Sequence, residues 1–312
     1  MRVLVMGTGG TGGYFGGLLA RAGEDVTFVA RGAHLEAIRA AGLTVRSRIL
    51  GDFRMPARAV ADPGAVGPVD LVLFCVKAYD TESAAAALRP AIGADTVILP
   101  VQNGIDGAER IGRVLGPGHV VGGLAAVSSV IEAPGVIDHR AGPGRIELGE
   151  LDGGSSARTE RIAAALRNAG IPVALRPDIR VALWEKFVLI CGLSGLTALT
   201  RLPIGAVLAC PETRALLEAC LAETEAVGRA RSVPLPEGCA ARTMAFFGQA
   251  DPRVRGSLYY DLVAGRRLEI ETLNGTVVRL GRAAGVPTPA NFAIHAALRP
   301  YADGPPEGAG PA

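Results

Sequence analysis

The first half of the chain alternates short apolar runs with polar, glycine-bearing stretches. Four runs rich in Val, Ile, Leu and Phe are each followed by a turn and a helix-like segment, at residues 2–7, 25–30, 70–76 and 96–102. This alternation is typical of a parallel sheet that is doubly wound with helices. Further strand-like pieces are separated by glycine and proline, which predicts antiparallel hairpins at one edge of the sheet. They lie at 120–129, 135–140 and 145–149, and a helix at 156–169 and a strand near 171–175 follow them.

After Pro177 the pattern changes to long apolar segments with helical spacing. We therefore predict an all-α C-terminal domain over residues 177–303. Asp178 is placed to cap its first helix, Pro211 lies in the first turn of the second, and Gly285 ends the fifth. The Gly- and Pro-rich tail, residues 304–312, is predicted to be disordered. The expected helices lie at about 179–198, 211–231, 237–248, 256–264, 267–284 and 289–301.

Three glycines between the first strand and the first helix have the spacing GxGxxG, namely Gly7, Gly9 and Gly12. In this motif the first glycine forms a tight turn, the second lets a pyrophosphate approach the backbone, and the third lets the helix pack closely. Glycine makes up 42 of the 312 residues, so the spacing alone is weak, and a glycine turn that binds nothing is the alternative. The flanking strand and helix favour a dinucleotide. We therefore predict an N-terminal α/β domain, Rossmann-like and doubly wound, over residues 1–176.

The second strand ends at Ala30 and Arg31, with no Asp or Glu at the position that would bind the ribose 2′-hydroxyl of NAD. A carboxylate there would repel a 2′-phosphate, whereas a guanidinium can bind one through two hydrogen bonds. Arg31 therefore favours NADP(H), the alternative being a solvated surface arginine.

Composition narrows the classes of partner. Lys and Arg total 32 and Asp and Glu total 30, so there is no net field to attract nucleic acid or an anionic membrane. The longest uncharged apolar stretch, between Lys186 and Arg201, is shorter than the roughly 20 residues that span a bilayer, and we interpret it as a buried helix. We expect a cytoplasmic protein with a small-molecule partner, because no secretory signal is visible and the five cysteines are interpreted as free thiols. The oligomeric state stays open, with a homodimer among the alternatives.

Other chemistries are disfavoured. The four histidines show no metal-ligand spacing, and the sequence contains no GxSxG or CxxC string. The sequence therefore indicates neither a metal site nor a hydrolase.

Four separated strings, in this order, give the chain a family resemblance. They are VKAYD at 76–80, QNG at 102–104, LWEKF at 183–187 and SLYYDLVAGRRLEIETLNG at 257–275. From Arg2 to about Arg299 the chain resembles the ketopantoate reductase (2-dehydropantoate 2-reductase) family of pantothenate biosynthesis. The resemblance implies NADPH-dependent reduction of a 2-oxo acid, ketopantoate, to a 2-hydroxy acid, pantoate, with the substrate between the domains.

The resemblance also implies roles for single residues. It places Lys77 near the cofactor and Asn103 near the nicotinamide and the substrate, at strand ends where ligands of parallel sheets collect. It makes Lys186 the acid that neutralises the oxygen when a hydride reaches the ketone carbon. The alternatives are a solvated loop charge for Lys77, a turn residue for Asn103 and a lysine at the helix rim for Lys186.

Two more residues match family positions. Glu269 would pair with Lys186 or orient the substrate, and Ser257 would receive the substrate carboxylate. The alternatives are a helix-surface charge for Glu269 and a helix N-cap for Ser257.

The chain departs from the family where the substrate's polar partners are expected. One and two turns after Lys186, on the same helix face, the family has two asparagines, whereas this chain has Ile190 and Ser194. A third family asparagine aligns with Val254. We keep Ser194 as a substrate-binding candidate. Three hypotheses stay open: a ketopantoate reductase, a reductase of a more apolar 2-oxo acid, and a non-catalytic NADP(H) sensor.

Overall fold

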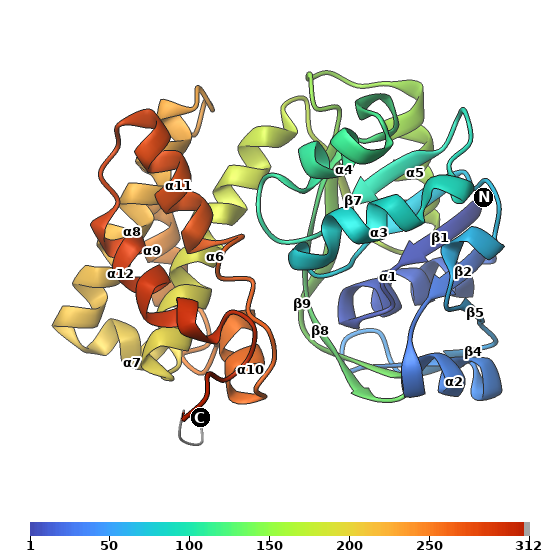
Figure 1. Ribbon diagram of the computed structural model, residues 1–312, viewed down its shortest axis with the longest axis horizontal. Coiled ribbons are helices and arrows are strands. Elements are labelled where there is room, and N and C mark those ends of the chain that lie inside the picture. The colour runs from blue at the N-terminus through green and yellow to red at the C-terminus, as the bar shows by residue number, and fades with distance from the viewer. Residues whose placement is uncertain (309–312) are drawn as a thin grey trace. The chain divides into compact units, whose positions relative to one another are not determined.

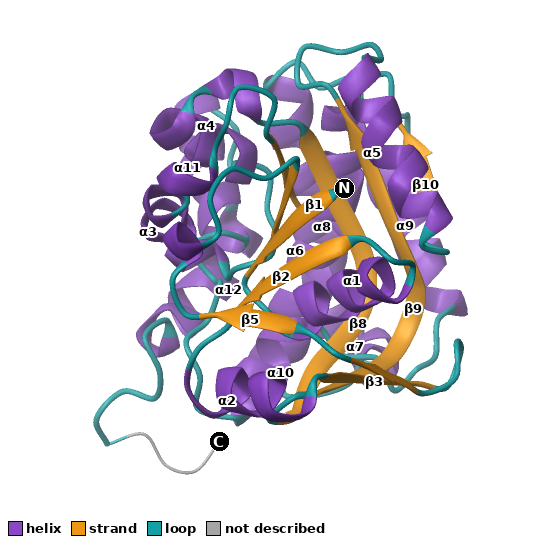
Figure 2. Ribbon diagram, turned by 90° about the vertical axis from the view of Figure 1, so that its right-hand side faces the viewer, coloured by secondary structure: helices purple, strands orange, loops and turns teal. Residues whose placement is uncertain are grey.

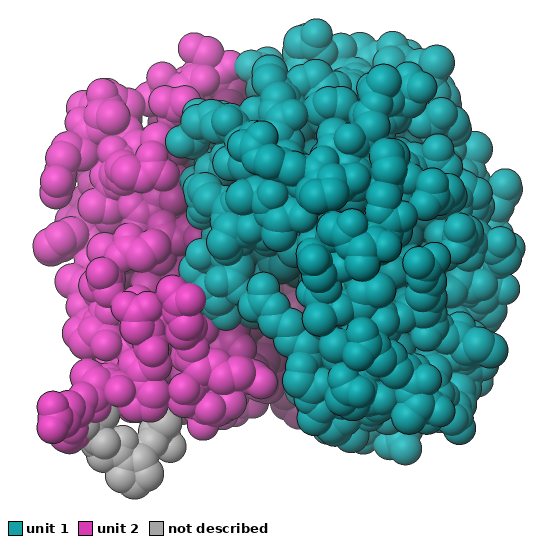
Figure 3. Space-filling model, turned by 45° about the vertical axis from the view of Figure 1, so that its right-hand side comes forward, with its two compact units in different colours: residues 1–182 teal, residues 183–312 magenta. Residues whose placement is uncertain are grey.

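The computed structural model describes residues 1–308 and divides into two compact units (Figure 3). The first unit, residues 1–182, contains all the strands of the described residues, and the second, from residue 183 onward, is helical (Figure 1). This confirms the predicted fold class, an α/β domain followed by an all-α domain. The boundary between the units lies inside helix α6, Ile179–Thr200.

The strands of the first unit form two sheets. The parallel sheet has the order β5-β2-β1-β6-β7, with strands Arg58–Val60, Asp25–Val29, Arg2–Met6, Leu71–Phe74 and Val97–Pro100. The second sheet has the order β10-β9-β3-β4, with β8 paired to β9, and its strands are Val173–Leu175, Val136–Gly149, Leu43–Ser47, Phe53–Met55 and Gly122–Ala133. The α-helices of this unit are α1 (Gly10–Arg21), α2 (Gly32–Ala41), α3 (Thr81–Ala87), α4 (Gly107–Leu115) and α5 (Ala157–Asn168).

The alternation of side chains along the parallel strands explains the layers. On β1, Val3 and Val5 point into one hydrophobic cluster, which includes residues of α1, α5 and the second sheet. Leu4 and Met6 point to the opposite face, into a cluster with residues of α3 and α4. The parallel sheet is therefore buried on both faces, as its apolar runs predict (Figures 1 and 2).

Helix α1 packs against both sheets because it is rich in glycine. A Cβ on Gly16 would lie 2.6 Å from Phe28 of the parallel sheet, and a Cβ on Gly13 would lie 2.6 Å from Ile137 of the second sheet. Both distances are too short for a real side chain, so the glycines let α1 approach the two sheets at once.

The predicted hairpin is present, but it is longer than expected. β8 and β9 pair antiparallel, and β9 runs unbroken from Val136 to Gly149, where we expected two separate strands. Gly142 and Gly144 have φ values of 90° and 57°, yet they lie in an irregular stretch within the pairing and do not end a strand. Positive φ suits a bulge as well as a turn, and the sequence alone does not distinguish the two. The hairpin also belongs to the second sheet, which joins it to β3, β4 and β10.

The helices of the C-terminal half follow the prediction with two exceptions. They are α6 and then α7 (Ile204–Ala209), α8 (Pro211–Ala230), α9 (Cys239–Gln249), α10 (Ser257–Val263), α11 (Asn274–Ala284) and α12 (Pro289–Leu298), followed by a 3-10 turn at Arg299–Tyr301. We did not predict the short α7. The predicted helix 267–284 is wrong in its first half, because α11 begins only at Asn274. The Leu268 N–H donates to the carbonyl of Ala302, 2.9 Å away, so a contact distant in sequence holds this segment in an irregular, largely buried path.

The predicted helix ends are confirmed. The Asp178 carboxylate accepts from the backbone N–H of Arg180 at the start of α6, Pro211 lies in the first turn of α8, and Gly285 ends α11 with φ 70°. Of the predicted disordered tail, residues 304–308 form turns and bends, while 309–312 lie outside the described residues.

Helix α6 is 22 residues long and, among residues 1–308, the one helix long and apolar enough to cross a membrane. Of its most apolar stretch, 61% is buried inside the protein, in agreement with the predicted buried helix. All five cysteines are free thiols.

Candidate cofactor and catalytic site

The glycine turn after β1 meets the requirements of its motif. Gly7 has φ 95°, and a Cβ there would lie 2.9 Å from the backbone nitrogen of Val76. A Cβ on Gly12 would lie 2.2 Å from the Gly7 carbonyl oxygen, so no larger residue fits between the turn and the helix. A Cβ on Gly9 would meet nothing within 4 Å. The backbone at Gly9, the N-cap of α1, is therefore open to a ligand, and no side chain caps the helix end.

Four predicted cofactor elements follow neighbouring parallel strands. Along the order β2-β1-β6-β7, the residues after the strands are Arg31, the glycine turn, Lys77 and Asn103. Because the carboxyl ends of parallel strands share one edge, the sheet brings these residues to the same edge, over about 14 Å at the usual strand spacing. Arg31 is exposed, and Lys77 and Asn103 are partly exposed. The edge thus presents, in order, a cation, the glycine turn, a second cation and an amide.

Two residues that we did not predict hold the loop that carries Lys77. The Gln102 side-chain amide donates to the Val76 carbonyl at 2.8 Å and to the Thr81 hydroxyl at 3.0 Å. Arg110 on α4 donates to the Ala78 carbonyl at 2.8 Å. Gln102 lies in the QNG string, next to Asn103, and that string was the one sequence feature that pointed to it. The contacts of the Gln102 side chain depend on the pairing of β6 with β7, which the string does not show.

Arg110 is itself fixed by a carboxylate. Its Nε and Nη2 both donate to Glu82 at 2.7 Å, and this pairing lowers the pKa of Glu82 below its usual value. The ion pair therefore holds the loop in one orientation near neutral pH.

His34 is another residue without a sequence signal. It lies on α2 three residues after Arg31, and its Nδ1 accepts from the backbone N–H of Gly135 at 3.0 Å. Burial lowers the pKa of His34, which keeps the ring neutral and its Nδ1 free to accept. His34 thus connects the helix that follows the 2′-phosphate candidate to the β8–β9 hairpin.

In the helical unit, the predicted catalytic lysine lies on α6, two residues after Trp184 and directly before Phe187. Trp184 and Phe187 are buried and meet edge to face, with ring centroids 5.5 Å apart. Lys186 is partly exposed, and so is Ile190 one turn later. Lys186 is thus a partly exposed cation beside a buried apolar stretch of α6.

Ser194, two turns after Lys186, packs against the segment that leads into α10. A Cβ on Gly256 would lie 2.4 Å from both Cα and Oγ of Ser194, and the Gly256 N–H donates to the Thr197 hydroxyl at 3.0 Å. Ser194 is 3% exposed. This close approach leaves no room for an asparagine at 194 without moving the chain at Gly256. Ser257 follows directly as the first residue of α10, whose N-cap is Gly256, so the N-cap interpretation of Ser257 is wrong.

Glu269 is buried, with 4% of its surface exposed, and it lies in the irregular segment before α11. The alternative of a helix-surface charge is therefore wrong. A buried carboxylate is stable only when cations or hydrogen-bond donors compensate it. This makes Glu269 a functional candidate.

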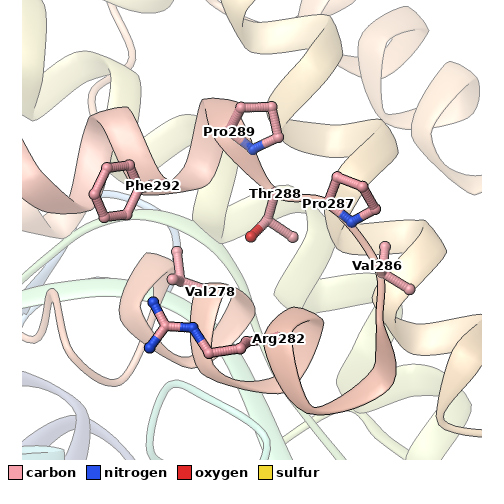
Figure 4. A pocket seen from close by; sticks show the side chains of 7 residues that line it. All are labelled: Val278, Arg282, Val286, Pro287, Thr288, Pro289 and Phe292. Carbon is pink, nitrogen blue, oxygen red and sulfur yellow. The ribbon is translucent and has the colours of Figure 1, made fainter.

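The described residues also contain a hollow of about 350 Å³ between α11 and α12 (Figure 4). None of the predicted site residues lines it; its lining is Val278, Arg282, Val286, Pro287, Thr288, Pro289 and Phe292. Within residues 1–308, no group of three His, Cys, Asp or Glu side chains could hold a metal ion.

Comparisons with known proteins show which family the chain resembles along most of its length. Residues 3–153 match the family model "Ketopantoate reductase PanE/ApbA", and residues 178–302 match "Ketopantoate reductase PanE/ApbA C terminal". A 2-dehydropantoate 2-reductase of Mesorhizobium japonicum is 32% identical over 96% of this chain and 97% of its own length. The crystal structure of a PanE/ApbA family ketopantoate reductase from Ralstonia eutropha shares 37% identity over 96% of this chain and 97% of that one, with a TM-score of 0.89. A D-mandelate dehydrogenase has a TM-score of 0.88 at 21% identity over 96% and 97% of the chains, which shows a shared fold alone.

The fold and the ordered strand-end residues define a nicotinamide-dependent oxidoreductase with a helical second domain. Within that class, the chain belongs to the ketopantoate reductase family, as the sequence resemblance predicted. The family's cofactor is NADP(H), and its relatives support NADPH-dependent reduction of a 2-oxo acid. The chain fits this cofactor because the backbone at Gly9 is open and Arg31 is exposed at the end of β2.

Proposed function

We propose that this enzyme reduces a 2-oxo acid to a 2-hydroxy acid with NADPH, with ketopantoate as the first substrate to test. Lys186 donates the proton, Glu269 pairs with it, Ser257 receives the substrate carboxylate, and Asn103 orients the nicotinamide and the substrate. Gly7, Gly9, Gly12, Arg31 and Lys77 bind the cofactor.

One observation about the cations supports this proposal most strongly. Of the 32 basic residues, 30 are arginine and only Lys77 and Lys186 are lysine. An arginine stays charged at any physiological pH and cannot act as an acid, whereas a lysine amine can lose its proton. A chain that otherwise uses arginine thus has an amine at the position where the proposed reaction needs a proton donor.

The proposed chemistry balances with one hydride and one proton. NADPH, when bound, supplies a hydride to the ketone carbon. The Lys186 ammonium gives a proton from Nζ to the oxygen, so the C=O group becomes a CH–OH group and the amine is left neutral. Glu269 favours the charged ammonium before the reaction, since a nearby carboxylate opposes its deprotonation.

The proposal is tested by NADPH absorbance on a panel of 2-oxo acids with the parent enzyme, Lys186→Ala and Lys186→Arg. We expect kcat to fall by roughly 10²- to 10⁴-fold in both variants, while NADPH affinity changes little. Lys186→Arg is the sharper variant, because it keeps the charge and removes the acid. Full activity of Lys186→Arg would show that the residue acts only through its charge, and a parent that reduces no 2-oxo acid would favour the NADP(H) sensor.

Ile190 favours a second candidate substrate with an apolar tail. Ile190 presents a branched hydrocarbon side chain one turn from Lys186. A substrate hydroxyl that is buried against it has no hydrogen-bond partner there, which costs about 1 to 3 kcal/mol. The panel therefore includes 3,3-dimethyl-2-oxobutanoate, which is ketopantoate without its hydroxyl. A kcat/KM at least about 10-fold higher for this compound would favour the apolar alternative. A strong preference for ketopantoate would show that other residues bind the hydroxyl.

A further inference from the structure

Arg255 lies in an extended segment that is fixed at both ends within the helical unit. On one side of it, the Val254 carbonyl accepts from the Ile204 N–H at 2.9 Å. On the other, the Gly256 N–H donates to the Thr197 hydroxyl, and Gly256 packs on Ser194 of α6. The position of the Arg255 backbone is thus set by α6 and α7, directly before Ser257.

The guanidinium of Arg255 has an unused donor. Its Cζ lies 4.8 Å from the centre of the Tyr259 ring, and Nη1 makes one long hydrogen bond, 3.4 Å, to the Arg253 carbonyl. Its Nε is buried and meets no acceptor among the described residues. A buried charged donor normally has an acceptor, so this one is placed for a group that the protein itself does not supply.

The neighbouring arginine shows the contrast. Arg253 is 86% exposed and donates from Nε and Nη2 to both carboxylate oxygens of Asp251, at 3.0 and 2.8 Å. Both of these Arg253 donors therefore have acceptors within the same loop. Arg255 has the same side chain two residues later, but within the described residues its guanidinium contacts a backbone carbonyl and an aromatic ring, and no carboxylate.

We propose that Arg255 binds the carboxylate of the 2-oxo acid, with Nε and one terminal nitrogen donating to its two oxygens. This inference rests on the proposed function and adds a specificity residue to it. A carboxylate matches the planar fork of arginine, and Ser257, two residues on, is the proposed partner of the same group. The charged guanidinium at the substrate carboxylate compensates for two amide side chains, which the family has at the positions of Ile190 and Ser194. The enzyme then recognises its substrates more by their acid group than by their tail.

The test compares the parent with Arg255→Met, Arg255→Lys and the matched control Arg253→Met. For each, KM and kcat are measured with a 2-oxo acid and with the corresponding 2-oxo amide, which lacks the charge. Loss of a charge-assisted fork should raise KM for the acid by about 10- to 100-fold in Arg255→Met. We expect a much smaller change for the amide and no change for either substrate in Arg253→Met.

The outcomes separate this inference from a structural role. Equal increases in KM for acid and amide would mean that Arg255 only shapes the site, which would overturn the inference. If Arg255→Met fails to fold, Arg255→Lys decides, because lysine keeps the charge over Tyr259 but not the fork, so KM for the acid should still rise.

Binding of oxamate, a 2-oxo acid mimic, is measured by calorimetry with saturating NADPH, so that the inference and the proposed function can fail separately. A parent that binds oxamate through Arg255 but reduces no 2-oxo acid would contradict the proposed function alone. A parent that reduces 2-oxo acids while Arg255→Met binds oxamate as tightly would contradict the inference alone. A parent that neither binds oxamate nor reduces a 2-oxo acid would contradict both.

Discussion

Replacing Gly9 or Gly12 by alanine should separate cofactor binding from packing at the glycine turn. The Cβ of an alanine at 12 would lie 2.2 Å from the Gly7 carbonyl oxygen and 3.0 Å from Val5, whereas ordinary contacts begin near 3.4 Å. The turn or α1 must then shift by about 1 Å, and such overpacking costs about 1 to 3 kcal/mol. For a unit of this size we expect the melting temperature to fall by about 2 to 12 °C.

Alanine at 9 should behave differently. Its Cβ would meet nothing within 4 Å, and the backbone at φ −79° and ψ −164° suits alanine, so the melting temperature should stay unchanged. The methyl group would occupy the space through which a pyrophosphate reaches the amino end of α1. Loss of one charge-assisted hydrogen bond there should raise the Kd for NADPH by about 10-fold or more.

Both variants are compared with the parent by thermal unfolding, with and without NADPH, and by fluorescence titration of the cofactor. The expected pattern is reciprocal: Gly12→Ala loses stability without cofactor, and Gly9→Ala loses only the stabilisation by NADPH. Tight NADPH binding by Gly9→Ala would show that the pyrophosphate does not pass over Gly9. An unchanged melting temperature for Gly12→Ala would show that α1 can move away from the glycine turn without loss of stability.

Two further predictions concern charged residues. The parent should bind NADPH about 10- to 100-fold more tightly than NADH, and Arg31→Asp should reverse this order; equal affinity of the parent for both cofactors would refute the role of Arg31. The second concerns Glu150, which accepts from Nε and Nη2 of Arg158 at 2.8 and 2.5 Å, a pairing that lowers the pKa of its carboxyl. Its stabilisation is present above the ordinary carboxyl pKa of 4.5 and is lost as the pH falls through the lowered value. Glu150→Gln should therefore cost about 1 to 2 kcal/mol at pH 7 and converge with the parent in acid, as denaturant unfolding at several pH values would show.

Much of the candidate cofactor edge of the parallel sheet could be predicted from the sequence because its signals are local. The apolar runs define the strands, and Arg31 is found within two residues of a strand end. The family resemblance singles out Lys77 and Asn103, each three residues after a strand. Parallel pairing then brings all strand ends to one edge. The same local rules predicted the caps at Asp178 and Gly285.

The sequence was less informative where contacts between distant residues override local pattern. The irregular segment that contains Glu269 reads as helix, yet the bond from Leu268 to the Ala302 carbonyl holds it out of one. Gln102 lies in the QNG string, but its hydrogen bonds to Val76 and Thr81 could not be predicted, because they depend on the neighbouring strand.

The sequence by itself determined the division into an α/β part and a helical part, the family and the order of the strand-end residues, because strand ends and helix faces repeat at fixed short intervals. Only the tertiary structure decided that α1 lies between two sheets, that Gly256 closes the space beside Ser194, and that Arg255 has a buried donor without an acceptor. These features depend on which residues the fold brings together from distant parts of the chain. Local sequence patterns do not predict such contacts.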